Sequence, residues 1–175
     1  MIISLPPVDA SGAASVAGTL VFGIGTASNN GLGNAQVYTT DAIGHFTTIY
    51  KGIPYPGSYL DTGTSVLSIL ASALLGIPLC AANTAAGGDY CPSTIVSDTA
   101  TTLGANGATG TVAFPIANAN ILVNSMNWAF DDLATPFPSH PVAFAWGLPF
   151  FFGRNVFVAI EGQSTPAGVG PYWAY

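Results

Sequence analysis

Short runs of β-branched and aromatic residues alternate along the chain with clusters of Gly, Asn, Asp and Pro. Such runs favour β-strands, because branched and aromatic side chains pack well on a pleated sheet, and the clusters between them favour turns. The predicted strands lie at residues 16–24, 36–40, 45–51, 58–60, 94–97, 109–116 and 155–161, with a further candidate at 121–123. The pattern therefore predicts a protein built mainly from short strands.

Helical signals are scarce in comparison. Residues 69–75 predict a short helix, and residues 149–152 predict a single helical turn. Pro54, Pro56 and Gly57 predict a break in the chain just before the strand at 58–60. Many short strands joined by Gly, Pro and Asn turns predict an all-β sandwich or barrel-like fold with minor helix. No repeat, charge run or linker divides the chain, so we predict a single domain over residues 1–175.

Charged side chains are rare in this chain. Among its 175 residues, eight acids stand against two bases, Lys51 and Arg154, for a net charge of −6. Proteins that bind nucleic acid cluster Lys and Arg to neutralise phosphates, so this composition excludes nucleic acid as a partner. A surface with so few charges favours an extracellular or acid-adapted protein. It also weakens the repulsion between copies, which favours a homo-oligomer.

The two most apolar stretches, residues 66–79 and 143–160, do not predict membrane spans. The first is shorter than the roughly 20 apolar residues that a spanning helix needs, and the second is interrupted by Pro149, Gly153 and Arg154. We expect both in the core. The first residues lack the basic segment and long apolar stretch of a secretory signal. We therefore expect the chain to begin inside a longer protein, with any signal upstream.

Cys80 and Cys91 lie in a loop rich in Gly, Ala and Asn. We expect a disulfide that closes this loop, worth roughly 2–3 kcal/mol by the chain-entropy estimate. A zinc site would need two more Cys or His residues at ligand spacing, whereas His45 and His140 are isolated. The pair therefore predicts an oxidising compartment, and we expect neither a metal nor a cofactor.

Residues 59–66 (YLDTGTSV) carry the candidate chemistry. Tyr59 and Leu60 end a predicted strand, and Asp61 follows immediately after it. Thr62 and Thr64 offer hydroxyl donors, and Gly63 permits a tight turn. A carboxylate held by several donors is oriented and stabilised in its charged form, which suits the activation of water. Asp61 is thus the candidate catalytic residue, with Thr62, Gly63 and Thr64 positioning it; the alternative is an aspartate that only caps a turn.

This segment resembles the active-site loop of the pepsin-like aspartic peptidases, in which two hydrophobic residues precede Asp-Thr/Ser-Gly-Thr/Ser. Lobes of that family also carry two hydrophobic residues and a glycine downstream, followed by a helical turn and a strand. Residues 145–147 (AWG), 148–152 (LPFFF) and 155–161 (NVFVAIE) match these three elements in order. The resemblance covers roughly residues 50–162, and a loop-closing cysteine pair between the elements is common in the family. It implies one lobe of the pepsin/retropepsin-like fold and hydrolysis of peptide bonds at acid pH.

A closer resemblance is to an uncharacterised family of bacterial cell-envelope proteins. It rests on residues 4–26 (SLPPVDASGAASVAGTLVFGIGT) and 146–162 (WGLPFFFGRNVFVAIEG). Full-length members of that family carry two aspartate-loop segments, so the resemblance implies that this chain corresponds to their C-terminal half. It also implies a location outside the cell or in the envelope. No activity is established for that family.

Peptide hydrolysis of this kind needs two carboxylates that share one proton, one acting on water and the other on the carbonyl oxygen. The sequence holds one aspartate loop: Asp98 begins Asp-Thr-Ala, without the glycine, and Asp131-Asp132 lacks the pattern. Two copies paired about a twofold axis, or a missing partner lobe, would supply the second aspartate for a peptide or protein substrate. Alternatively, the domain is inactive and assembles with itself or a partner, for example through its aromatic residues 170–175.

Three further residues receive structural interpretations. Trp146 is expected to pack in the core, because it lies in a long apolar stretch. Arg154 and Glu161 are expected to form a simple ion pair without a chemical role.

Overall fold

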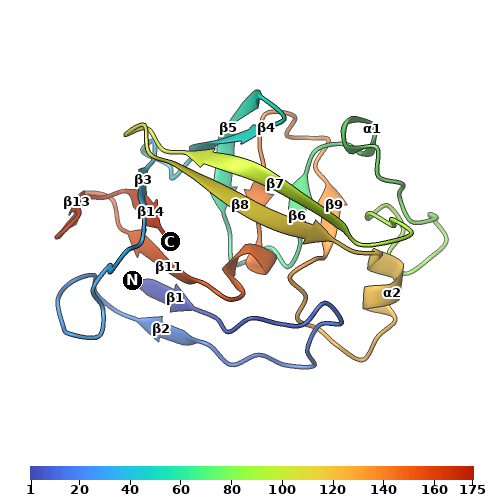
Figure 1. The fold of residues 1–175 in the computed structure, drawn as a ribbon, viewed down its shortest axis with the longest axis horizontal. Helices are drawn as coiled ribbons and strands as arrows, with labels where there is room; N and C mark the ends of the chain where they lie inside the picture. Colours follow the sequence, from blue (N-terminus) through green and yellow to red (C-terminus); the bar gives the residue numbers. More distant parts are fainter.

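The structure of this chain is a computed structural model that describes residues 1–175, apart from the side chain of Ser72. It is mostly β, as the sequence predicts (Figure 1). In chain order its strands are β1 (Ile2–Ser4), β2 (Thr19–Val21), β3 (Val37–Thr39), β4 (Phe46–Tyr50), β5 (Ile53–Leu60), β6 (Leu67–Ile69), β7 (Val96–Leu103), β8 (Thr109–Ile116), β9 (Ala134–Pro136), β10 (Ala145–Trp146), β11 (Asn155–Ala159), β12 (Ser164–Thr165), β13 (Gly168–Val169) and β14 (Tyr172–Ala174). The helices are α1 (Ser72–Leu75), α2 (Ala119–Val123) and the 3-10 turn η1 (Leu148–Phe151).

The larger sheet has the strand order β8-β7-β4-β5-β10-β6-β9. Its short strand β10 lies between β5 and β6, although about 80 residues separate it from both in the sequence. β10 runs parallel to β5, with Ala145 opposite Tyr59 and Trp146 opposite Leu60. Because the two strands point the same way, the residues that follow them, Asp61 and Gly147, emerge at the same edge of the sheet.

The second sheet has the order β2-β1-β11-β14-β3 and joins the two ends of the chain. Its central strands β11 and β14 pair antiparallel, and Figure 1 marks both termini beside this sheet. Residues 170–175, for which docking as an edge strand is the alternative to contact with a partner, contain strand β14, which lies inside this sheet and not at its edge. β14 lies between β11 and β3, and its alternate side chains Tyr172 and Ala174 are buried, because successive residues of a strand face opposite sides of the sheet.

The core centres on Trp146, which is 1% exposed, as the sequence predicts. Its ring lies 5.4 Å from that of Phe114 and 5.5 Å from that of Phe144, centroid to centroid. Its indole N–H donates to the Thr48 hydroxyl at 3.0 Å, which satisfies its one buried donor. Through these contacts Trp146 of β10, on one side of β5, packs against residues of β4 and β8, on the other side.

The predicted break at Pro54 and Pro56 is wrong, because β5 runs through both prolines. Proline lacks the N–H that a strand needs on its hydrogen-bonded side. Here β10 pairs only with Tyr59 and Leu60, so the first half of β5 has β4 alone as a strand partner. Both prolines are exposed on this open side, where the missing N–H costs little.

Other element boundaries also differ from the sequence predictions. The candidate strand at 121–123 is helical: α2 begins after Asn118, whose side chain accepts a hydrogen bond from the Ile121 N–H. This is the usual cap at a helix start, and it outweighs the β-branched residues. The predicted helix over 69–75 is reduced to α1, because Leu67–Ile69 pair with β9 as strand β6. The single turn expected at 149–152 is confirmed as η1.

The predicted disulfide between Cys80 and Cys91 is confirmed. It closes a loop whose backbone is also bonded internally, with the Cys80 N–H donating to the Asp89 carbonyl at 2.8 Å and the Cys91 N–H to the Pro78 carbonyl at 2.7 Å. None of the helices in the described residues is long and apolar enough to span a membrane.

Removing this disulfide is expected to lower the free energy of unfolding by roughly 2–3 kcal/mol, because the bridge restricts the unfolded chain. Urea denaturation of the Cys80→Ala/Cys91→Ala variant would measure the change. A thiol reductant should destabilise the wild type by a similar amount and leave the variant unaffected. Equal midpoints for both proteins without reductant would contradict the prediction.

Candidate active site

Strand β10 fixes the backbone that leads into the candidate loop. The Tyr59 N–H donates to the Phe144 carbonyl at 3.1 Å, and the Asp61 N–H donates to the Trp146 carbonyl at 2.9 Å. Leu60, between them, is buried in the core. Asp61 is therefore held at the end of β5 by ordinary sheet hydrogen bonds, and its side chain begins where the sheet ends.

Both carboxylate oxygens of Asp61 accept a hydrogen bond from the loop that follows. Oδ1 accepts from the Gly63 N–H at 2.8 Å, and Oδ2 accepts from the Thr64 hydroxyl at 2.6 Å. A Cβ atom at Gly63 would lie 3.1 Å from Oδ1, so the absence of a side chain there lets the N–H approach closely. Two donors on two oxygens orient the carboxylate plane, and the bond from the residue two positions on is also the one that an aspartate makes when it caps a turn.

Of the three predicted positioning residues, the structure brings two into contact with Asp61. Gly63 and Thr64 bond its carboxylate, as described above. Thr62 is exposed, and its side chain makes no hydrogen bond within the described part of the chain. The hydroxyl of Thr62 is thus available to a molecule outside this chain.

Gly147 allows the chain that follows β10 to pass close to the backbone of residues 64–66. A Cβ atom there would lie 2.0 Å from the Val66 carbonyl oxygen and 2.6 Å from that of Thr64. The next residue, Leu148, donates its N–H to the Thr64 carbonyl at 2.7 Å. The glycine of the downstream Ala-Trp-Gly pattern therefore supports the aspartate loop directly.

The carboxylate of Asp61 is half-buried, and its loop lies open to solvent at Thr62, Gly63 and Ser65. Its nearest titratable neighbour along the chain is Tyr59. Burial, and then the charge of Asp61, raise the pKa of the Tyr59 hydroxyl. A second molecule or lobe can reach Asp61 from the open side of the loop.

Neither of the other acidic candidates reaches Asp61 within the chain. Asp132 lies just before β9, at the same edge of the sheet but three strand spacings away, or roughly 14 Å. Asp98 lies near the start of β7, toward the opposite end of the sheet, where its carboxylate accepts the hydroxyl of Tyr50. The structure therefore agrees with the sequence that these residues do not form a pair of carboxylates with Asp61.

The predicted ion pair of Arg154 and Glu161 is not formed among the described residues. The Arg154 guanidinium instead donates to the Phe150 carbonyl and lies 4.6 Å from the centre of the Phe150 ring. Glu161 is exposed at the end of β11. Arg154 precedes β11 and Glu161 follows it, so the extended strand keeps the two residues roughly 20 Å apart.

Comparison with known proteins matches residues 1–175 to the family described as "Protein of unknown function (DUF3443)". No curated protein and no solved structure matches the chain. The family description names no reaction, so a function has to be inferred from the residues themselves.

Proposed function

Because the chain belongs to the DUF3443 family of proteins of unknown function, we propose from its own geometry that it is one lobe of an aspartic peptidase. In this proposal Asp61 acts on peptide bonds at acid pH once a second aspartate pairs with it. The observation that carries the proposal is the carboxylate of Asp61, with a donor on each oxygen, at an edge open to solvent.

The arrangement around the loop supports the resemblance to pepsin-like lobes. The Ala-Trp-Gly element lies beside the strand that leads to Asp61, and the helical turn η1 and strand β11 follow it in the expected order. The glycine of that element contacts the backbone of the aspartate loop. Segments far apart in the sequence thus meet where the proposed chemistry needs them.

The proposed reaction needs one proton shared between Asp61 and its partner aspartate. The ionised member takes a proton from water, whose oxygen attacks the peptide carbonyl, while the protonated member donates to the carbonyl oxygen. Collapse of the tetrahedral intermediate breaks the C–N bond, and the amine leaves with a proton. Gly63 and Thr64 would hold Asp61 in plane throughout, and the need for one protonated carboxyl favours acid pH.

The partner aspartate would come from a second copy or from another lobe. The open side of the aspartate loop leaves room for either. The disulfide in the structure supports a location in an oxidising compartment, which we propose to be the cell exterior or the bacterial envelope.

An acid-pH cleavage assay combined with absolute mass tests this proposal. We expect cleavage of an unfolded protein substrate between about pH 3 and pH 6, confined to fractions in which light scattering shows a dimer or a complex with a second lobe. Monomer fractions should be inactive, because one aspartate cannot share its proton. A dimer that cleaves nothing over this pH range would contradict the self-paired peptidase, and cleavage by strict monomers would contradict the two-aspartate mechanism.

A second candidate is an inactive β-domain that assembles with itself or a partner. The exposed apolar residues that follow α2 favour it: Met126 is 87% exposed and Trp128 is 84% exposed. Oligomers that persist in Asp61→Asn but dissociate in Trp128→Ser would support this candidate. Oligomers that Trp128→Ser leaves intact would count against it.

A further inference from the structure

Arg154 is a half-buried cation without a carboxylate partner. Within the described chain no acidic oxygen lies inside the 4.0 Å that defines an ion pair with it. Its contacts are the Phe150 carbonyl and the face of the Phe150 ring. Burial lowers the pKa of this guanidinium, and the charges of Tyr175 and Asp131 oppose that fall. A guanidinium carries five donors, so most of its hydrogen-bonding capacity is unused by the protein.

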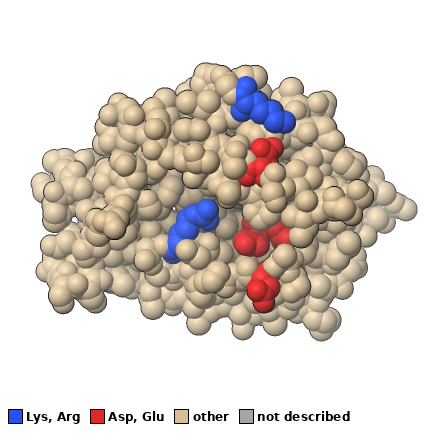
Figure 2. All heavy atoms as spheres, viewed as in Figure 1, with Lys and Arg blue, Asp and Glu red and all other residues tan. Residues whose placement is uncertain are grey.

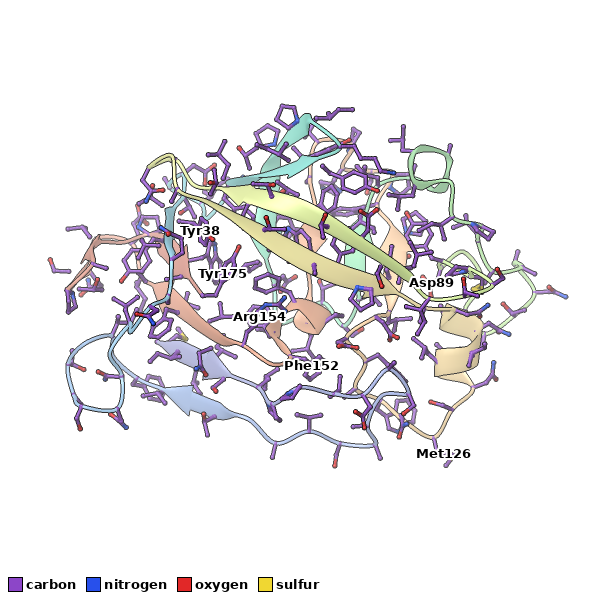
Figure 3. All side chains as sticks on the ribbon, viewed as in Figure 1. Tyr38, Asp89, Met126, Phe152, Arg154 and Tyr175 are labelled. Carbon is purple, nitrogen blue, oxygen red and sulfur yellow. A yellow bond between two sulfur atoms is a disulfide. The ribbon has the colours of Figure 1, made fainter. Side chains whose placement is uncertain are left out.

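This guanidinium lines a cavity of about 270 Å³ together with an acid that is equally unpaired. The acid is Asp131, which is half-buried and makes no ion pair among the described residues. Burial raises the pKa of Asp131, and the charge of Arg154 opposes that rise. Figure 2 shows a basic side chain and acidic side chains on opposite sides of a hollow, at the position where Figure 3 labels Arg154.

The remaining walls of the cavity are mostly apolar. They include Phe114, Trp146, Phe150 and Phe152, which come from β8, β10, η1 and the residue after η1. These four aromatic side chains are at most 6% exposed, so only a small part of each reaches the cavity. The cavity thus offers one positive and one negative group, which form no ion pair although each shifts the pKa of the other.

We propose that this cavity binds a free α-amino acid with an apolar side chain, its carboxylate on Arg154, its ammonium on Asp131 and its side chain against Phe114 and Phe150. A guanidinium binds a carboxylate through two parallel hydrogen bonds, which suits the first contact. The charge of Asp9, which acts on Asp131, adds to the attraction for an ammonium group. A ligand with a single charge would leave the other buried group unpaired, so the cavity selects for a zwitterion. Its volume, at the small end of ligand pockets, limits the ligand to about the size of one amino acid.

Calorimetric titration of the wild-type protein tests the proposal without any variant. L-leucine is the probe, with 4-methylpentanoate lacking the ammonium and 3-methylbutylamine lacking the carboxylate. We expect L-leucine to bind and each analogue to bind at least about 10-fold more weakly, because each loses one charge-assisted contact. The absence of saturable binding of L-leucine at millimolar concentration would overturn the proposal and leave a cavity filled by water alone. Equal binding of L-leucine and both analogues would also overturn it.

Two variants locate the site. Arg154→Gln and Asp131→Asn should each weaken L-leucine binding by about 10- to 100-fold, whereas the matched controls Lys51→Gln and Asp89→Asn should leave it unchanged. Asp131→Asn keeps the test valid if Arg154→Gln fails to fold, because Asp131 makes no ion pair among the described residues and an asparagine can keep the hydrogen bond from its own backbone N–H. Asp61→Asn should bind L-leucine normally, so failure of the peptidase proposal would not affect this one. Unchanged binding in Asp131→Asn would overturn the assignment.

Discussion

Replacing Asp61 with asparagine is expected to lower peptide hydrolysis by the paired protein by about 10²–10⁴-fold or more. An asparagine can still accept the Gly63 N–H on its amide oxygen, so the loop should keep its shape. It cannot hold the proton that two carboxylates must share, and the chemical step therefore fails. The measurement is the cleavage rate at acid pH of wild type and variant at equal concentration and equal oligomeric state.

The control for this variant is Asp89→Asn, which removes one carboxylate from the disulfide loop, at the position labelled in Figure 3. It changes the net charge by the same amount and leaves the Asp61 loop untouched. Its cleavage rate should equal that of the wild type. Equal rates for Asp61→Asn and wild type would show that Asp61 is not the catalytic residue, even if the protein cleaves peptides.

The free energy of unfolding is expected to fall by about 2 kcal/mol between pH 4 and pH 8 because of Asp132. This side chain is 1% exposed, and neither of its oxygens has a hydrogen-bond partner among the described residues. Burial, and then the charge of Asp131, raise the pKa of Asp132 from 3.8 to about 6. A pKa raised on folding gives stability that is full below the unfolded pKa and is lost as pH rises through the folded one. The contribution of Asp132 to stability is therefore largest under the acid conditions that the proposed reaction needs.

The Asp132→Asn variant isolates this effect. Its amide does not ionise, so the stability difference between variant and wild type should shift by about 2 kcal/mol in favour of the variant from pH 4 to pH 8. Urea denaturation at several pH values measures it. Asp89→Asn again reports the effect of net charge alone. A difference that stays constant across this range would show that Asp132 does not carry the pH dependence.

Features set by neighbouring residues could be predicted from the sequence. The turn around Asp61 follows from Gly63 and Thr64, which lie within three residues of it, and the disulfide follows from two cysteines in one loop. The position of Trp146 also agrees with its apolar surroundings. Each of these features depends on residues that lie close together in the sequence, so the sequence pattern can predict it.

Features set by distant partners could not be predicted. Strand β5 tolerates its prolines because β10, about 80 residues later, covers only its last two residues. Arg154 and Asp131 line one cavity although 23 positions separate them, and nothing local distinguishes them from surface charges. In both cases the decisive information is which strand becomes the neighbour, and the sequence alone does not specify it.

The second sheet also constrains how the chain can fold during its synthesis. β1 is synthesised about 150 residues before its partner β11, and β14 follows later still. At ordinary ribosomal rates β1 and β2 would wait on the order of ten seconds with an unpaired edge. An unpaired strand edge invites aggregation, so the nascent chain needs to be shielded or kept unfolded until β14 has emerged. We expect such a chain to need a chaperone that keeps it unfolded during synthesis, so that the second sheet forms only after release.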